Sequence, residues 1–143
     1  MVAVEPAPGA REAAASLFPA LTVRKGTAEA SGLPDAIADA VLLSGVVSLI
    51  DDLDAVLAEA ARVARPDGAI AIGDLFSSRR ATIRSSRNVF RSVESLTEHV
   101  ATFGWEVVEV GIGSPPPDAS WALAAAAVDR WIRRHHRDHP AFD

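Results

Sequence analysis

A length of 143 residues supports one domain with a single core, and 49% hydrophobic with 23% charged residues is ordinary for a globular protein. The chain has no cysteine, which excludes disulfides and thiolate catalysis and favours a reducing compartment, so we expect a cytoplasmic protein. The net charge of −5 argues against nucleic acid as a partner, because phosphate binding needs a concentrated positive surface. The first residues show no basic leader, and the longest apolar region, Ala36–Ile50, is too short to cross a bilayer, so we expect no signal peptide and no membrane partner.

The charge is unevenly distributed along the chain. Residues 1–75 hold eleven acids against five bases, whereas residues 76–143 hold eight acids against nine arginines. The arginines fall into two clusters, Arg79–Arg91 and Arg130–Arg137. Such clusters are either solvated faces or contacts for an anionic ligand or an acidic protein surface.

The first half of the sequence predicts alternating strands and helices. A short β-branched run, Val2–Val4, predicts a strand that ends at Glu5-Pro6, and the alanine-rich stretch Arg11–Leu17 predicts a helix. Leu21–Arg24 alternates as a second strand. The continuous apolar run Ala40–Leu43 predicts a parallel strand that is buried on both faces.

The second half continues this alternation. A helix is predicted over Asp51–Ala64, stopped by Pro66-Asp67-Gly68, and a strand over Ala69–Ile72, which closes at Gly73-Asp74. A second helix is predicted from the capping residue Ser92 to Phe103, followed by a strand over Glu106–Val110. A last helix is predicted to begin at Ser120 and to carry Trp121 and Trp131 on one face. This order indicates a single α/β domain, residues 1–143, with a mostly parallel sheet.

The ordered segments resemble the middle of small-molecule class I S-adenosylmethionine-dependent methyltransferases. The similar stretches are Gly26–Asp35, Asp39–Val47, Leu57–Gly68, Ile70–Asp74 and Phe90–Val110. The resemblance covers about residues 2–110 and implies a Rossmann-like methyltransferase fold that uses S-adenosylmethionine.

By this resemblance the chain starts too late to include the family's first strand and the glycine-rich cofactor loop that follows it. The final antiparallel strand of the family also has no counterpart here, so we expect a truncated fold. The family's first strand lies between its second and fourth, and a gap there leaves backbone groups unpaired. Either Val2–Val4 shifts to pair with Ala40–Leu43, or another chain fills the gap, and we therefore expect a homodimer or a complex with another protein.

The resemblance also implies positions for cofactor contacts. Glu5, at the end of the first predicted strand, matches the acid that accepts hydrogen bonds from the ribose hydroxyls. Thr27, Ala28 and Glu29 match the adenine-contacting segment, where Thr27 replaces the usual Asp and so offers an acceptor without charge. Ser44 begins the segment that faces the methyl group.

Candidate substrate contacts lie after the segments that match the fourth and fifth strands of the family. Gly45 and Ser48 lie after the fourth family strand, where relatives place histidines, and Asp74 ends the fifth and either orients substrate or caps a turn. If residues 77–91 form a helical lid, Arg80, Arg84, Arg87 and Arg91 make one basic stripe that binds an anion or a partner. No catalytic base is identified, because Ser48 and Leu49 are not bases near neutral pH.

The histidines His135, His136 and His139 near the C-terminus are interpreted as a helix-end cluster favoured by the helix dipole, not as a metal site, although His135 and His139 have i, i+4 spacing. Three functions remain open: a methyltransferase subunit completed by a partner chain, a catalytically silent structural or regulatory relative, and a fold reused for another small-molecule reaction or for binding.

Overall fold

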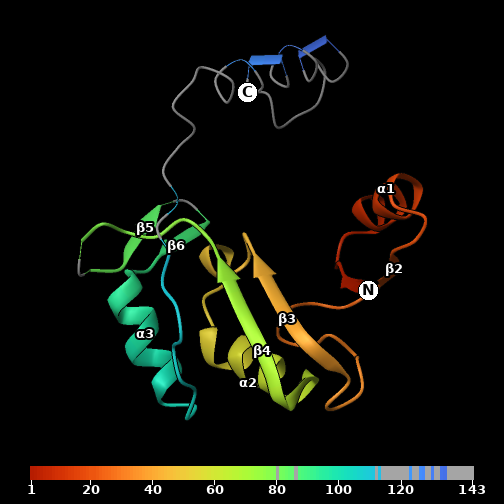
Figure 1. The fold of residues 1–143 in the computed structure, drawn as a ribbon. Helices are drawn as coiled ribbons and strands as arrows, with labels where there is room; N and C mark the ends of the chain where they lie inside the picture. The colour runs from red at the N-terminus through yellow and green to blue at the C-terminus, as the bar shows by residue number, and fades with distance from the viewer. Residues whose placement is uncertain are drawn as a thin grey trace. The chain divides into compact units, whose positions relative to one another are not determined.

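The computed structural model describes residues 1–79, 81–85, 87–111 and 113, together with residues 123, 126, 127, 130, 133 and 134. It divides into two units, Met1–Val107 and Val108–Asp143, and every element named below belongs to the first unit (Figure 1). The elements, in chain order, are β1 (Val2–Val4), α1 (Pro8–Leu17), β2 (Thr22–Arg24), β3 (Ala38–Ser44), the 3-10 turn η1 (Val47–Leu49), α2 (Leu53–Val63), β4 (Ala64–Gly73), β5 (Ile83–Ser85), β6 (Asn88–Phe90) and α3 (Val93–Ala101). None of the helices found among these described residues has the length and apolar character needed to span a membrane.

The strands form pairs that do not join into one sheet. β1 pairs with β2 in parallel, with Val4 opposite Arg24, and β3 pairs with β4 in parallel, with Leu43 opposite Ile72. In the part of the chain that the structure describes, β1 and β3 belong to different two-stranded sheets. The sequence-based alternative in which Val2–Val4 shifts to pair with Ala40–Leu43 is therefore wrong.

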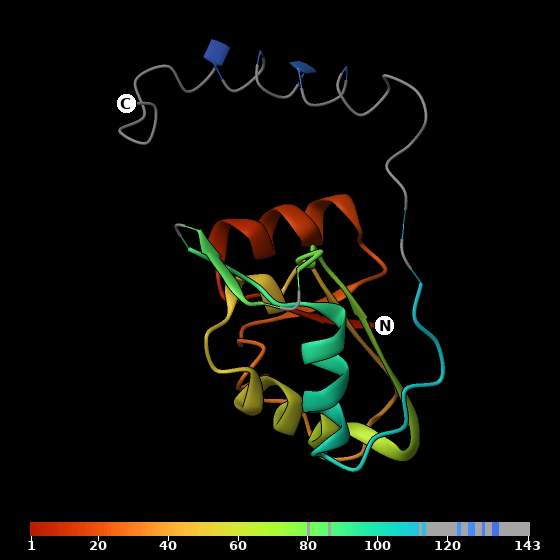
Figure 2. The same cartoon turned by 90° about the vertical axis from the view of Figure 1, so that its left-hand side faces the viewer.

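The hydrophobic core lies between the β3–β4 sheet and the helices α2 and α3. Its buried members are Leu43, Val47, Leu53, Val56, Leu57, Ala60, Leu96 and Val100. Apolar residues recur at helical spacing along α2, so one face of that helix is buried and Val56 and Leu57 are fully enclosed. The view along the edge of the sheet shows both helices on the same side of β3 and β4 (Figure 2).

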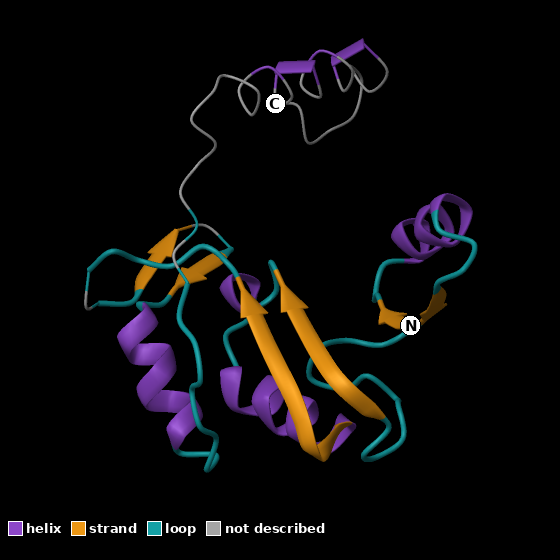
Figure 3. Cartoon of the chain, in the orientation of Figure 1, coloured by secondary structure: helices purple, strands orange, loops and turns teal. Residues whose placement is uncertain are grey.

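The opposite face of the β3–β4 sheet is not covered within the described residues. Side chains alternate along β3, so Val41 and Leu43 point to the core while Leu42, which is 72% exposed, points away from it. Figure 3 shows these two strands, the longest that the structure describes, in front of α2, with α3 to one side of them. The expectation that Ala40–Leu43 is buried on both faces is thus wrong in this unit, because only one helical layer packs on the strand.

Capping explains where the two core helices begin. The side chain of Asp52 accepts a hydrogen bond from Ala55 N (3.0 Å), and that of Ser92 accepts one from Ser95 N (3.1 Å). Gly104 adopts φ +74° just after α3, as expected of a residue that terminates a helix. The helix α2 ends at Val63, earlier than predicted, because β4 already begins at Ala64 and pairs irregularly with β3 before Ala69.

Two predicted elements differ in the structure. β5 and β6 pair in antiparallel, with Arg84 opposite Val89, so the helical arginine stripe does not exist. The β-branched residues Ile83 and Val89 favour these strands and lie opposite Phe90 and Arg84. Glu106–Val110 contains no strand, because its backbone pairs with none of the strands that the structure describes. Of the predicted last helix, the structure describes six residues between 123 and 134, all of them helical, whereas Ser120, Trp121, Trp131 and the three histidines lie outside the described residues.

Candidate functional site

The carboxyl ends of β3 and β4 meet at a network around Asp74. Its Oδ2 accepts a hydrogen bond from Ser48 N (2.9 Å), and its Oδ1 accepts one from Leu75 N (2.7 Å). The N–H of Gly45 donates to the carbonyl of Gly73 (2.8 Å) and so extends the pairing of the two strands. Asp74 therefore holds the turn after β3 through Ser48, in addition to its bond with the residue that follows it.

Gly45 and Ser48 are placed close to this network, and Ser44 ends β3 beside them. Gly45 has φ +65°, a conformation that favours glycine, and a side chain built there would point into open space. The Ser48 side chain is buried, whereas Ser44 is exposed. The segment thus offers small residues and backbone groups around an open position but no basic side chain.

Glu5 lies directly after β1, where its backbone N–H donates to Arg24 O (3.0 Å) and fixes it beside the end of β2. Its Oε1 accepts a hydrogen bond from Ala7 N (2.8 Å), and its backbone carbonyl accepts one from Arg11 NH1 (2.9 Å). A carboxylate has about four acceptor positions, so this single bond leaves Glu5 able to accept more.

The segment Thr27–Ala30, after β2, forms a closed turn. Thr27 N donates to Ala30 O (3.0 Å), and Ala30 N donates to both Thr27 O (3.3 Å) and Thr27 Oγ1 (3.2 Å). Ala28 packs against the hydrophobic core, and Glu29 is exposed. The hydroxyl and both backbone groups of Thr27 thus take part in its own turn, and the backbone of Ala28 remains the candidate ligand contact.

Glu59 and Arg62 on α2 hold this loop and were missed by sequence reasoning. Glu59 accepts hydrogen bonds from the Ser31 backbone and side chain and pairs with Arg62 through both carboxylate oxygens. The Arg62 guanidinium, followed by the Ser31 bonds, lowers the pKa of Glu59 to about 2, although desolvation opposes this shift. The i, i+3 spacing of Glu59 and Arg62 was the available signal, but it pointed only to a local pair.

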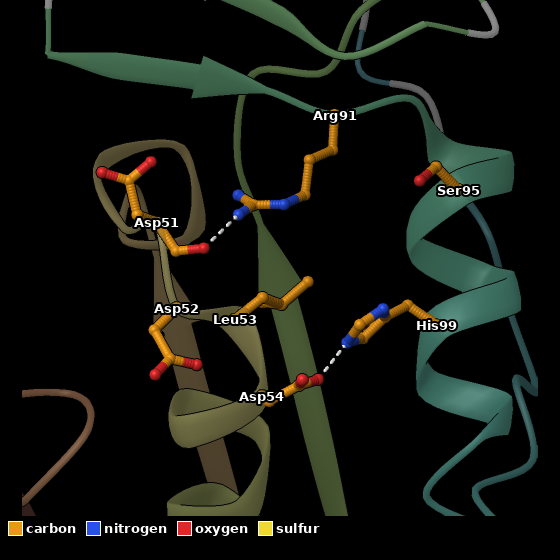
Figure 4. A pocket seen from close by; sticks show the side chains of 7 residues that line it. All are labelled: Asp51, Asp52, Leu53, Asp54, Arg91, Ser95 and His99. Atoms are coloured by element: carbon orange, nitrogen blue, oxygen red, sulfur yellow. Dashed lines mark hydrogen bonds and ion pairs between the residues drawn. The ribbon is translucent and has the colours of Figure 1, made fainter.

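A small cavity of about 180 Å³ lies between α2 and α3 and does not include the candidate cofactor residues (Figure 4). Its lining residues are Asp51, Asp52, Leu53, Asp54, Arg91, Ser95 and His99. Arg91 donates to the carbonyls of Val47 (2.7 Å), Ile50 (2.9 Å) and Asp51 (3.2 Å), and burial, aided by the charge of Arg84, lowers its pKa. The cavity is smaller than the roughly 300–1,000 Å³ of typical ligand pockets and is occupied at its rim by structural contacts.

Two arginines of the predicted anion-binding stripe, Arg84 and Arg91, are engaged by the segment that follows β3. Arg84 pairs with Asp51 and so ties β5 to the loop before α2, and Arg80 lies outside the described residues. No group of three or more histidines or carboxylates suited to a metal occurs among the side chains that the structure describes.

Comparisons with known proteins agree with this geometry. The family model described as "Methyltransferase domain" matches residues 1–72. A SAM-dependent methyltransferase from Thermotoga maritima, titled a possible histamine N-methyltransferase, superposes with a TM-score of 0.63 at 25% identity over 73% of this chain. The YcgJ protein from Bacillus subtilis superposes with a TM-score of 0.60 over 71% of this chain, and at 19% identity it shows the fold alone.

The chain spans about half of each of these two proteins, 54% and 50% of their lengths. No curated protein matches the sequence.

Proposed function

The chain belongs to the methyltransferase domain family, and from this premise we propose that it is a subunit for S-adenosylmethionine-dependent methylation of a small molecule that needs a partner chain to bind the cofactor. The fold is α/β and Rossmann-like, as in the solved structures that it matches. Partner dependence is supported by one observation, the separation of the β1–β2 and β3–β4 sheets.

The hydrogen bonds at the strand ends identify the free edges. Glu5 N donates to Arg24 O and Gly45 N donates to Gly73 O, so these residues point their backbone groups toward β2 and β4 respectively. Because backbone groups alternate in direction along a strand, those of Val4 on β1 and of Leu42 and Ser44 on β3 point away from their partners.

Free parallel edges favour association. A buried backbone group left without a hydrogen bond costs about 1–3 kcal/mol, and the edge of β3 has neither proline nor lysine to discourage pairing. The exposed Leu42 side chain adds apolar surface beside this edge. We therefore propose a homodimer or a heteromeric complex in which another chain supplies the backbone groups that these edges lack.

The residues present fit part of a cofactor site. The Glu5 carboxylate suits ribose hydroxyls, and the backbone of Ala28 suits the adenine ring, in line with the family resemblance. S-adenosylmethionine would supply an electrophilic methyl group when bound. The turn after β3 would contribute Gly45 and Ser48 to the substrate side, with Asp74 holding that turn in place.

The substrate must bring its own reactivity. The turn Ser44–Ile50 has no histidine, lysine or acid, so it offers no general base for a hydroxyl or an ammonium nucleophile. A substrate that is nucleophilic without deprotonation, or a base from the partner chain, meets this requirement.

Isothermal titration calorimetry with S-adenosylmethionine tests the proposal. We expect weak or no binding by the purified chain alone, and micromolar or tighter binding once the chain is co-expressed with the products of neighbouring genes. Submicromolar binding by the isolated chain would contradict the partner requirement.

A catalytically silent relative is the second candidate. It is favoured by the local use of the candidate ligands, since Glu5 accepts from Ala7 N and Thr27 accepts from Ala30 N. Absence of S-adenosylmethionine binding in every assembly, together with a stable complex, would support this candidate over the first.

A further inference from the structure

We infer that Glu59 is a positioning residue for cofactor binding, because from α2 it fixes the loop between β2 and β3 that carries the backbone of Thr27 and Ala28. The effect of Glu59 on cofactor affinity rests on the proposed function, whereas the effect of Glu59 on the loop does not.

The Glu59 carboxylate is enclosed and fully engaged. Its side chain is only 12% exposed, and its Oε1 accepts from Ser31 N (2.8 Å), Ser31 Oγ (2.5 Å) and Arg62 NH2 (2.7 Å). Its Oε2 accepts from Arg62 Nε (2.8 Å). Paired guanidinium–carboxylate bonds are both strong and directional, so they set the orientation in which Glu59 meets Ser31.

Ser31 connects Glu59 to the start of the loop and to β1. It is 8% exposed, and its Oγ also accepts from Leu33 N (3.1 Å). Its carbonyl oxygen lies only 2.6 Å from the position that a Cβ on Gly26 would take, and a methyl of Val4 lies 2.7 Å from the same position. Ser31, Gly26 and β1 are thus in close contact, and only glycine fits between them.

The far end of the loop is also held by the last turn of α2. Arg62 pairs with Asp35 through its side chain and accepts from Ala36 N through its carbonyl (2.8 Å). Val63 O accepts from Ile37 N (3.0 Å). The middle of the loop, at Ser31, and its far end are therefore fixed to the same helix, which in turn is anchored in the core.

The closed turn Thr27–Ala30 lies immediately before Ser31, so its position depends on these bonds. A ligand held by backbone groups requires them to be in place before binding, because ordering a loop during binding reduces affinity. Loss of the Glu59 charge should therefore loosen the turn and weaken the grip on an adenine-containing ligand without changing any residue that would touch it.

Amide hydrogen exchange of the full chain tests the effect on the loop. In Glu59→Gln we expect the Ala30 and Ser31 amides to exchange at least tenfold faster, with Leu96 and Val100 of α3 within twofold of the parent. The matched control Glu98→Gln makes the same chemical change at an exposed position of α3 and should leave the loop amides unchanged. Unchanged loop amides in Glu59→Gln, or equal acceleration in loop and core, would overturn the inference.

Kinetics tests the effect on the cofactor, in whichever assembly transfers a methyl group. Glu59→Gln should raise KM for S-adenosylmethionine about tenfold and leave kcat within twofold, and Ser31→Ala should shift KM in the same direction. A loosened loop with an unchanged KM would refute the positioning role. If no assembly binds S-adenosylmethionine, the proposed function fails, while the exchange result still decides whether Glu59 fixes the loop. Should Glu59→Gln not fold, the same measurements on Ser31→Ala decide both.

Discussion

The two halves of the first unit differ in how well their helices and strands are capped and packed. In the half that contains β3, α2, β4 and α3, both helices have capping side chains and bury one face against the sheet. In the half that contains β1, α1 and β2, the helix has no side-chain cap and no buried residue, and each strand has three residues. Helices and strands with so little buried surface gain little stability from packing. Their ordering therefore depends on contacts with elements outside their own half.

The contacts that join the halves are few and specific. They run from Glu59 through Ser31 to Gly26 and Val4. The stable half therefore carries the core and Ser44, while Glu5, Thr27, Ala28 and Glu29 lie in or next to the other half, which contacts the stable half through Ser31 and Ala28. Such a division places the ligand-binding elements at the low-stability end of the molecule.

The largest expected effect separates the two helices. Leu57→Ala removes a fully buried side chain from α2 and should lower the free energy of unfolding by about 2–5 kcal/mol. Leu17→Ala on α1, where the side chain is 71% exposed, should change it by less than about 0.5 kcal/mol. Urea unfolding followed by circular dichroism measures both. A similar loss in the free energy of unfolding for the two variants would contradict the difference in packing between the two halves.

Gly26→Ala tests the contact between the halves. The added Cβ would meet a backbone oxygen and a methyl group at less than 3 Å, so we expect a loss of about 1–3 kcal/mol in the free energy of unfolding. Gly9→Ala is the matched control, because a Cβ at Gly9 in α1 meets open space and alanine favours a helix. An unchanged free energy of unfolding in Gly26→Ala would mean that the two halves are not in close contact at Gly26.

Glu59 makes the connection dependent on pH. Its pKa in the folded chain, about 2, lies below its ordinary value of 4.5, so the ionised form stabilises the fold above pH 4.5 and this stabilisation is lost as pH falls toward 2. At neutral pH, Glu59→Gln should cost about 1–3 kcal/mol. Urea unfolding of parent and variant should show this difference shrink between pH 4.5 and 2, and a constant difference would contradict the assigned cause.

The sequence allowed the better-packed half to be predicted with small errors at its boundaries. A period of 3.6 along α2, together with Asp52 at its start, predicts that helix, and Ser92 predicts the start of α3. The strand β3 was predicted within two residues at each end, since its apolar run is bounded by polar or small residues. The strand β4 begins at Ala64, five residues before its predicted start, and runs through Pro66-Asp67-Gly68, which the sequence had predicted to be a turn.

The rest depended on contacts distant in sequence. The arginine spacing from Arg80 to Arg91 suited a helix, yet the chain pairs Ile83 with Phe90 between β5 and β6. The Asp74–Ser48 and Glu59–Ser31 hydrogen bonds join residues 26 and 28 positions apart, which no local pattern indicates. The roles of Glu5, Thr27, Ala28 and Ser44 toward the cofactor stay predictions.

The smallest expected effect concerns the missing cap of α1. Ala7 has φ −80° and ψ 124°, the extended geometry of an N-cap residue, but alanine offers no oxygen to the free N–H groups of the first turn. Ala7→Ser supplies that oxygen and should stabilise the helix by about 0.5–1 kcal/mol. Hydrogen exchange of α1 amides should slow about two- to fivefold, while α2 amides stay unchanged because the two halves open separately. Ala10→Ser places the same side chain inside the helix and should give no slowing, since serine there cannot cap. Equal slowing in α1 and α2 would show that the unit opens as a whole, and the division between a stable half and a dependent half would then fail.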